Sequence, residues 1–178
     1  MITLRNMRWP EDREHILSID TSFSTGQIYQ VVVNDNSFTL VEKTISIPFR
    51  KVFELSPEVD NFPNVNDVLI AEYQMRPVGI AVLNYDADNH RAMLQHIHVD
   101  AKHRRLGIGQ ALMEASLARA KEYQARCIWL ETQDVNYGAI QFYKKAGFNF
   151  CGLDLSLDER TEAEVQENAI FFMKLLST

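Results

Sequence analysis

The sequence contains few cysteines, no long apolar run and no excess of positive charge, and each shortage excludes a class of protein. Its two cysteines, Cys127 and Cys151, form no C-x-x-C pair and lie in apolar stretches, so we expect buried, reduced thiols. The five histidines lack a third ligand in a fixed pattern, and no metal is implied. No run approaches the roughly 20 apolar residues that span a bilayer, and the amino-terminal residues lack a secretory signal. We therefore expect a cytoplasmic protein without a membrane partner.

The charge balance excludes a dedicated nucleic-acid binder. The net charge is −6, whereas proteins that grip the phosphate backbone need clustered Lys and Arg. An acidic protein suits a cationic small-molecule substrate, although the most acidic segment, 154–167, is predicted to be a surface loop or a short helix. With 178 residues, 46% of them apolar, the chain can bury a sizeable core, and no repeat or linker divides it. We predict one domain over residues 1–178.

Local patterns predict the order strand, helix, strands, helix, strand, helix, strands. Pro10 begins a helix that is expected to end near Asp20, because proline suits the first helical position. Residues 27–33 and 38–45 form a predicted hairpin, after which Pro48, Pro57 and Pro63 break regular structure. The remaining predicted elements are strands at 1–5, 68–74, 78–85, 93–99, 126–132, 148–153 and 168–176, and helices at 107–123 and from Asn136 to Gly147.

The run from His98 to Leu112 indicates a diphosphate-binding loop. A strand ends, basic residues follow, and Gly107 and Gly109 open a helix whose predicted apolar face is Ile108, Ala111, Leu112, Ala115 and Ala118. Glycines at a helix start let backbone N–H groups approach an anion, which the helix dipole also favours. Arg104 and Arg105 supply positive charge at the rim. Two glycines alone are weak evidence, because many such loops are only turns.

Two motifs identify the family that the sequence resembles. Arg104, Gly107 and Gly109 match Arg/Gln-x-x-Gly-x-Gly/Ala, the acetyl-CoA signature of the GNAT family of N-acetyltransferases. The family's second recurrent segment is matched by Asn136, Ala139, Tyr143, Lys145, Gly147 and Phe148. The resemblance implies an α/β (α+β) fold with one mixed, mostly antiparallel central sheet, splayed strands and flanking helices. It also implies an enzyme that acetylates a primary amine, with its acetyl-CoA-binding core at about residues 93–148.

The resemblance assigns the coenzyme contacts. The backbone of Ile97 and Val99 is expected to pair with the pantetheine arm, and the hydroxyl of Tyr143 to lie near the sulfur as the general acid. From spacing alone, Tyr143 would instead be a core tyrosine whose hydroxyl is hydrogen-bonded. The full set of expected acetyl-CoA contacts is Ile97, Val99, Arg104, Arg105, Leu106, Gly107, Ile108, Gly109, Gln110, Asn136, Ala139, Tyr143 and Lys145.

The sequence leaves the proton acceptor open. Many family members use a glutamate on the strand before the loop, but here that strand reads Gln95-His-Ile-His-Val. Alternation puts His96 and His98 on one face and Gln95 on the other, and histidine titrates near neutral pH. We predict His98 or Glu131 as the base with equal weight. His96, Asp134 and a water molecule stay open as alternatives, as does a purely structural role for the histidines.

Further segments narrow the resemblance to streptothricin acetyltransferases. They run from Ile19-Asp-Thr-Ser-Phe-Ser-Thr to Phe150-Cys-Gly-Leu-Asp and include Trp129-Leu-Glu. This resemblance implies acetylation of the β-lysine amine of streptothricin, a cationic antibiotic, with Asp20, Glu131, Asp134 and Asp154 as predicted substrate contacts. The alternatives are an acetyltransferase for protein lysines or N-terminal amines, and an acetyl-CoA-binding regulatory module without catalysis. Family analogy also allows a homodimer.

Overall fold

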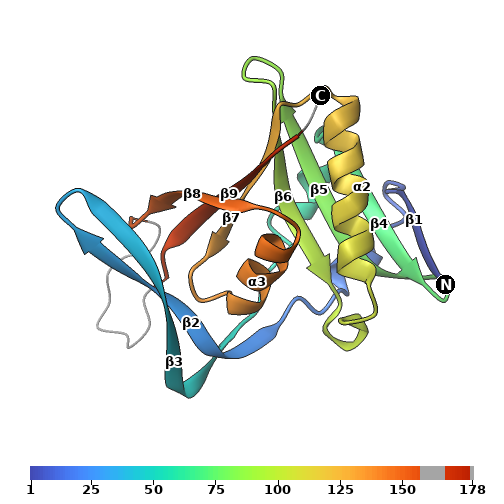
Figure 1. Cartoon of the computed structure of the whole chain (residues 1–178). Coiled ribbons are helices and arrows are strands. Elements are labelled where there is room, and N and C mark those ends of the chain that lie inside the picture. The colour runs from blue at the N-terminus through green and yellow to red at the C-terminus, as the bar shows by residue number, and fades with distance from the viewer. Residues whose placement is uncertain (157–166, 177–178) are drawn as a thin grey trace. The chain divides into compact units, whose positions relative to one another are not determined.

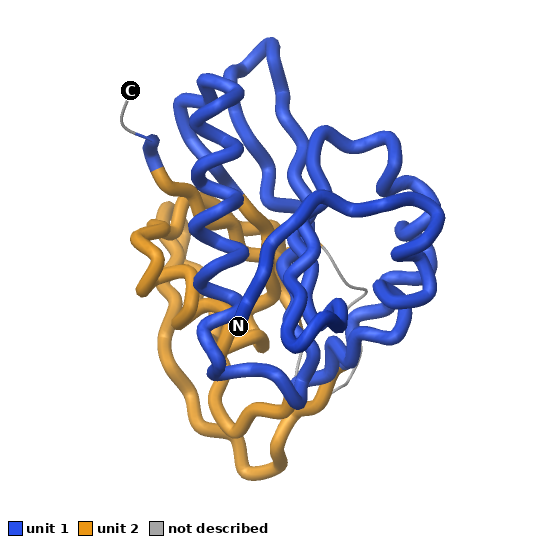
Figure 2. The backbone as a smooth tube through the Cα atoms, turned by 90° about the vertical axis from the view of Figure 1, so that its right-hand side faces the viewer, with its two compact units in different colours: residues 1–23, 52–129, 175–178 blue, residues 24–51, 130–174 orange. Residues whose placement is uncertain are grey.

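The computed structural model describes residues 1–156 and 167–176. Figure 2 shows the division of the chain into two compact units. The first unit consists of Met1–Phe23, Val52–Trp129 and Leu175–Thr178, and the second of Ser24–Lys51 and Leu130–Lys174. The prediction of one domain over residues 1–178 stays a prediction. Most of the acidic segment predicted at 154–167 lies outside the described residues.

The first unit is built on antiparallel strands backed by one long helix (Figure 1). Its sheet has the order β1-β4-β5-β6-β7. The neighbours among β1, β4, β5 and β6 pair antiparallel, whereas residues 127–129 of β7 pair parallel with residues 91–93 of β6. The elements are β1 (Ile2–Asn6), α1 (Arg13–Leu17), η1 (Val59–Asn64), β4 (Asp67–Tyr73), β5 (Arg76–Asp86), β6 (Arg91–Val99), η2 (Ala101–His103), α2 (Ile108–Glu122) and the first residues of β7 (Cys127–Gln133), whose residues from Leu130 belong to the second unit. The predicted meander is confirmed.

The second unit contains a long hairpin and the last helix. The hairpin β2 (Phe23–Asn34) and β3 (Ser37–Lys51) forms a two-stranded sheet. It is followed in the chain by α3 (Tyr137–Lys145) and by the antiparallel pair β8 (Asn149–Asp154) and β9 (Ala169–Leu175). With β9 and β8 next to β7, the larger sheet has seven strands. The predicted mixed, mostly antiparallel sheet with flanking helices is confirmed.

Both faces of the first unit's sheet are covered. On one face, α2 packs across β4, β5 and β6 (Figure 1). Gly79 permits this approach, because a Cβ there would lie 3.1 Å from Leu112 Cδ1 on the helix and 3.0 Å from the His98 carbonyl oxygen. On the other face, residues of α1 and η1 join the strands in a core cluster formed by Ile16, Ile19, Leu55, Val59, Phe62, Val68, Ile70, Ile80 and Val82.

Several local predictions were wrong, each for a physical reason. The helix expected from Pro10 begins only at Arg13, because residues 9–12 form a turn in which the Asp12 carboxylate accepts the Arg8 N–H. Pro48 lies inside β3, where a two-stranded sheet leaves one strand side free for a residue without an N–H. Ala118, predicted on the apolar face of the helix, is exposed. Cys151, expected to be buried, is exposed as well, whereas Cys127 is buried as predicted. The buried face of α2 is Ile108, Leu112, Met113, Ser116 and Ala120.

The described part of the chain contains no helix that is both long and apolar enough to cross a membrane.

An ion pair with a buried carboxylate fastens the first strand to the turn that follows it. Arg5 donates to the two oxygens of Asp12 at 2.6 and 2.8 Å, and Asp12 is 3% exposed. The hydrogen bond from Arg5 lowers the pKa of the Asp12 carboxyl more than burial raises it. A carboxyl whose pKa is lower in the folded than in the unfolded state stabilises the fold at pH values above the unfolded-state pKa. This stability is lost as the pH falls through the folded-state pKa.

Replacing Asp12 tests this pair. Asp12→Asn should lower the free energy of unfolding at pH 7 by about 2 kcal/mol, because it removes charge-assisted hydrogen bonds while Arg5 keeps its pair with Glu72 at 2.6 Å. The difference from the unaltered protein should begin to shrink as the pH falls below about 3.9, the unfolded-state pKa, and should disappear only below the lowered folded-state pKa of Asp12. Urea unfolding between pH 7 and pH 3 measures both effects. The control Asp60→Asn, which removes the exposed partner of Arg13, should leave the stability nearly unchanged, because exposed ion pairs contribute little. Equal stability of Asp12→Asn and the unaltered protein at pH 7 would contradict the prediction.

Candidate active site

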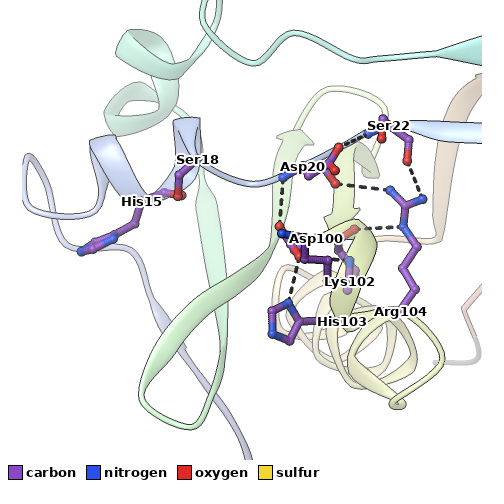
Figure 3. A network of polar contacts seen from close by, with 9 residues as sticks. His15, Ser18, Asp20, Ser22, Asp100, Lys102, His103 and Arg104 are labelled. Carbon is purple, nitrogen blue, oxygen red and sulfur yellow. Dashed lines mark hydrogen bonds and ion pairs between the residues drawn. The ribbon is translucent and has the colours of Figure 1, made fainter.

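The loop between β6 and α2 is tied to residues 20–22 through Asp100 (Figure 3). The Asp100 carboxylate accepts the N–H of Asp20 and the N–H of Lys102, each at 3.1 Å, and lies 2.9 Å from His103 Nδ1. Ala101 donates its N–H to the Asp20 carbonyl at 2.9 Å. Burial raises the pKa of the Asp100 carboxyl, but these donors lower it by more, so Asp100 is ionised at neutral pH. Asp100 therefore fixes the first turn of the loop.

Arg104 fixes the same loop from its other side. Its guanidinium donates to the carbonyl oxygens of Val99 at 3.1 Å, Ser22 at 2.6 Å and Asp20 at 3.4 Å (Figure 3). Burial lowers the pKa of the Arg104 guanidinium, and the nearby carboxylates of Asp20 and Asp100 oppose this by raising it. The guanidinium stays charged at any working pH. Arg104, which was predicted to supply positive charge at the rim of the loop, therefore also holds the loop to the backbone of residues 20–22 as a clamp. Its contact with a pyrophosphate stays a prediction.

The glycine loop has the geometry that the sequence predicts. Gly107 is the N-cap of α2 with φ 84°, and Arg105 also has a positive φ of 64°, so the chain turns sharply before the helix. The first amides of α2 have no partner within the helix and meet the positive end of its dipole, which suits an anion. Ile108 is buried and Leu106 is exposed. Gly109 is half-buried, and the side chain of Gln110 donates to Glu114 at 2.9 Å.

A β-bulge changes the predicted faces of β6. His96 pairs with Val82 but Leu94 pairs with Leu83, so Gln95 is an extra residue between them. Gln95 therefore departs from the predicted alternation, and its side chain reaches the same carboxylate as His96. Both Gln95 Nε2 and His96 Nε2 lie 2.9 Å from Oε2 of Glu58, which precedes η1. The predicted shared face of the two histidines is supported, since their ring centroids are 5.7 Å apart.

The two imidazoles belong to a row of rings along β6. His96 lies 5.7 Å from Phe62 and His98 lies 5.5 Å from Phe53, measured between ring centroids. Burial, together with repulsion from His96 and Arg104, lowers the pKa of His98 to about 4. His98 is therefore neutral at pH 7 and can accept a hydrogen bond or a proton. Ile97 and Val99, whose backbone is expected to pair with the pantetheine arm, are half-buried.

In the second unit, α3 positions the residues of the second motif. The Asn136 side-chain oxygen accepts the Ala139 N–H at 3.3 Å and caps the helix, and Gly147 ends it with φ 85°, as predicted. Tyr143 is 7% exposed, and burial raises the pKa of its hydroxyl, which stays protonated at working pH. Within the described residues this hydroxyl makes no hydrogen bond, unlike that of an ordinary core tyrosine. Lys145 is exposed in the last helical turn.

The four carboxylates predicted to contact the substrate have different surroundings. Asp134 is buried and accepts both the backbone N–H and the side-chain amide of Asn168, at 3.1 and 2.6 Å. These bonds give it a structural task, and its substrate contact stays a prediction. Glu131 is exposed on β7. Asp154 and Asp20 are exposed and accept the N–H of Ser156 and Ser22, respectively.

Sequence reasoning missed Glu58. It lies in a segment predicted to be irregular, between Pro57 and Val59, and no local motif connects it with β6. The one signal in the sequence was the absence of a carboxylate from β6 itself, which left room for one from another element. In the described part of the chain, no group of three or more His, Cys, Asp or Glu side chains could hold a metal ion.

Comparison with known proteins identifies the family. The model of the acetyltransferase (GNAT) family matches residues 39–148. The chain belongs to the GNAT family. This match spans the diphosphate loop, β6 and α3, and it confirms the predicted family and the class of enzyme, an N-acetyltransferase.

Similar GNAT proteins cover almost the whole chain. A streptothricin acetyltransferase from Streptomyces lavendulae is 34% identical over 171 residues, which cover 91% of this chain and 89% of that protein. The crystal structure of nourseothricin acetyltransferase superposes with a TM-score of 0.86 at 31% identity and covers 98% of both chains. A Bacillus anthracis protein solved in complex with acetyl coenzyme A superposes with a TM-score of 0.83 at 25% identity and covers 99% of this chain and 100% of that one.

Removing the Tyr143 hydroxyl tests its predicted role. Tyr143→Phe should lower kcat about 10²-fold, because a general acid contributes at least that much, and should leave the KM for acetyl-CoA nearly unchanged. Steady-state kinetics with a saturating amine measure both constants. The matched control is Tyr137→Phe, which removes a hydroxyl from the first turn of the same helix and should keep its kcat. An unchanged kcat in Tyr143→Phe would remove this residue from the chemistry.

Proposed function

We propose that this enzyme uses acetyl-CoA to acetylate a primary amine of a cationic small molecule, and that the amine is the β-lysine amine of a streptothricin antibiotic. The observation that carries the proposal is the near full-length similarity to streptothricin acetyltransferases, which extends well beyond the coenzyme motifs. A similar protein solved with acetyl coenzyme A supports the choice of co-substrate. Antibiotic resistance is the expected biological consequence.

The proposed coenzyme site uses backbone groups more than side chains. The amides at the start of α2, beginning at Gly107, are oriented to bind the pyrophosphate, and Arg105 adds positive charge nearby. The backbone of Ile97 and Val99 on β6 would pair with the pantetheine arm as an added strand. Asn136, whose oxygen already caps α3, is proposed to bond the arm as well. These roles follow the family resemblance and agree with the local geometry of each segment.

The chemistry follows from the thioester and the amine. An alkylammonium with a pKa of about 10.4 is mostly protonated at neutral pH, so the nitrogen must lose a proton before or during attack on the carbonyl carbon. A backbone N–H near Val99 would stabilise the oxyanion of the tetrahedral intermediate. When the C–S bond breaks, Tyr143 donates a proton to the thiolate. His98, neutral at pH 7, and Glu131, exposed on β7, are the acceptors predicted from the sequence.

The substrate charge fits the acidic protein. The net charge of −6 favours the approach of a polycationic antibiotic, and Asp20, Glu131 and Asp154 are exposed carboxylates. We expect binding of the antibiotic to weaken with ionic strength, because exposed charges are screened by salt. A cytoplasmic location and a homodimer stay predictions.

An amine panel tests the proposed function. Coenzyme A release is measured with acetyl-CoA and, separately, streptothricin, a polyamine, an aminoglycoside and a lysine peptide. We expect rapid release with streptothricin and slow release with the others, and mass spectrometry should place one acetyl group on the β-lysine amine. Release with the peptide but not with streptothricin would instead favour a protein acetyltransferase. Tight acetyl-CoA binding without turnover on any amine would favour a regulatory module.

A further inference from the structure

The strand β6 presents no carboxylate of its own, but the fold brings one to it. Glu58, in the turn that leads into η1, lies 37 and 38 positions before Gln95 and His96 in the sequence. Both of these side chains bond the same oxygen of Glu58, Oε2, at 2.9 Å. All of these residues belong to the first unit, so the arrangement is complete within it.

The orientation of this carboxylate is fixed by several bonds. Asn84 Nδ2 donates to Gln95 Oε1 at 2.6 Å, which turns the Gln95 amide so that its NH₂ group faces Glu58. The His96 ring is held against the buried Phe62, at 5.7 Å between ring centroids, so that its Nε2 also faces Glu58. With Oε2 occupied by two donors, Oε1 has no hydrogen-bond partner in the described part of the chain. The Glu58 side chain is 45% exposed, so a ligand can reach that oxygen.

We propose that Glu58 is the carboxylate that receives the reacting amine: its free oxygen, Oε1, binds the substrate's ammonium group and accepts the proton from the nitrogen during acetyl transfer. The bulge at Gln95 makes this possible, because it directs two neighbouring side chains of β6 to one carboxylate from another element. Glu58 lies neither on β6 with His98 nor on β7 with Glu131, the two acceptors predicted from the sequence. The inference rests on the proposed acetyltransferase function.

The charges around Glu58 suit this role. Burial raises the pKa of the Glu58 carboxyl, but the bonds from His96 and Gln95 and the nearby His98 lower it by more, so Glu58 is ionised at neutral pH. The titratable groups that face it are His96 and His98 on β6, and Arg104 acts on His98 from the loop. An ionised carboxylate attracts an ammonium ion and can accept a proton from it.

The step balances in atoms and charge. The amine nitrogen forms a bond to the carbonyl carbon, the C–S bond of the thioester breaks, and the electron pair leaves on sulfur. The ammonium nitrogen gives up two protons in turn, one to Glu58 Oε1 before it attacks and a second from the tetrahedral intermediate, and each passes from the exposed carboxyl to solvent. The thiolate takes a proton from Tyr143, which recovers one from solvent, so that one proton is released in each turnover. Glu58 thus returns to its ionised form after each turnover without any further reactant.

Glu58→Gln tests the proposal, because it keeps the shape of the side chain and removes its charge. We expect kcat/KM for the amine to fall about 10²-fold or more, the contribution typical of a general base, while acetyl-CoA binding measured by calorimetry stays unchanged. Glu58→Asp, which retains the charge on a shorter arm, should recover part of the lost activity. Asp60→Asn, two positions along and paired with Arg13 on the surface, is the matched control and should keep full activity.

The outcomes separate this inference from the proposed function. The assay uses whichever amine the unaltered protein acetylates fastest, so failure with streptothricin alone overturns the substrate and not Glu58. Full activity of Glu58→Gln overturns the inference. So does a loss of folding stability in Glu58→Gln with unchanged kcat/KM, since the carboxylate would then serve only to hold His96. Loss in Glu58→Gln with partial recovery in Glu58→Asp, while both variants bind acetyl-CoA normally, supports it.

Discussion

The site depends on the pair of clamps that holds the loop after β6. Asp100 at the start of the loop accepts the N–H of Asp20, and Arg104 in its middle donates to the carbonyl oxygens of Asp20 and Ser22. The loop therefore cannot move without breaking charge-assisted hydrogen bonds, which are stronger than neutral ones. The fixed loop leads into Gly107, which adopts its left-handed conformation without steric cost, and the first amides of α2 follow without a partner inside the helix, as an anion site requires.

In β6, the strand that leads into this loop, the backbone and the side chains have different roles. Its backbone around Ile97 and Val99 is proposed to bind the coenzyme arm, whereas its imidazoles lie in a row of rings that runs from Phe62 to Phe53. The bulge at Gln95 turns one further side chain towards Glu58 at the start of that row. A strand without acidic residues thereby gains contact with a carboxylate from another element, which is the basis of the role proposed for Glu58.

The sequence was most informative where function depends on short segments. Gly107, Asn136 and Gly147 could be placed because a helix start or end constrains a few consecutive residues: Gly107 lies at the start of α2, Asn136 caps α3, and Gly147 ends it, as predicted. Glu58 could not be found in this way, since its partners are 37 and 38 residues distant and meet it only through the packing of η1 against the sheet. The extra residue in β6 was equally invisible, because a bulge depends on the register of the partner strand.

The most direct test of the clamped loop is to compare Arg104→Lys with the unaltered protein in two measurements on the same samples, the acetyl-CoA dissociation constant and the free energy of unfolding. Lysine keeps the charge but cannot reach three carbonyl oxygens with a fixed fork of donors. If Arg104 organises the loop, the variant should lose about 1–2 kcal/mol of stability and about tenfold in acetyl-CoA affinity together. Unchanged stability would contradict the clamp, and a tenfold loss of affinity beside it would mean that Arg104 acts only through its predicted contact with the coenzyme.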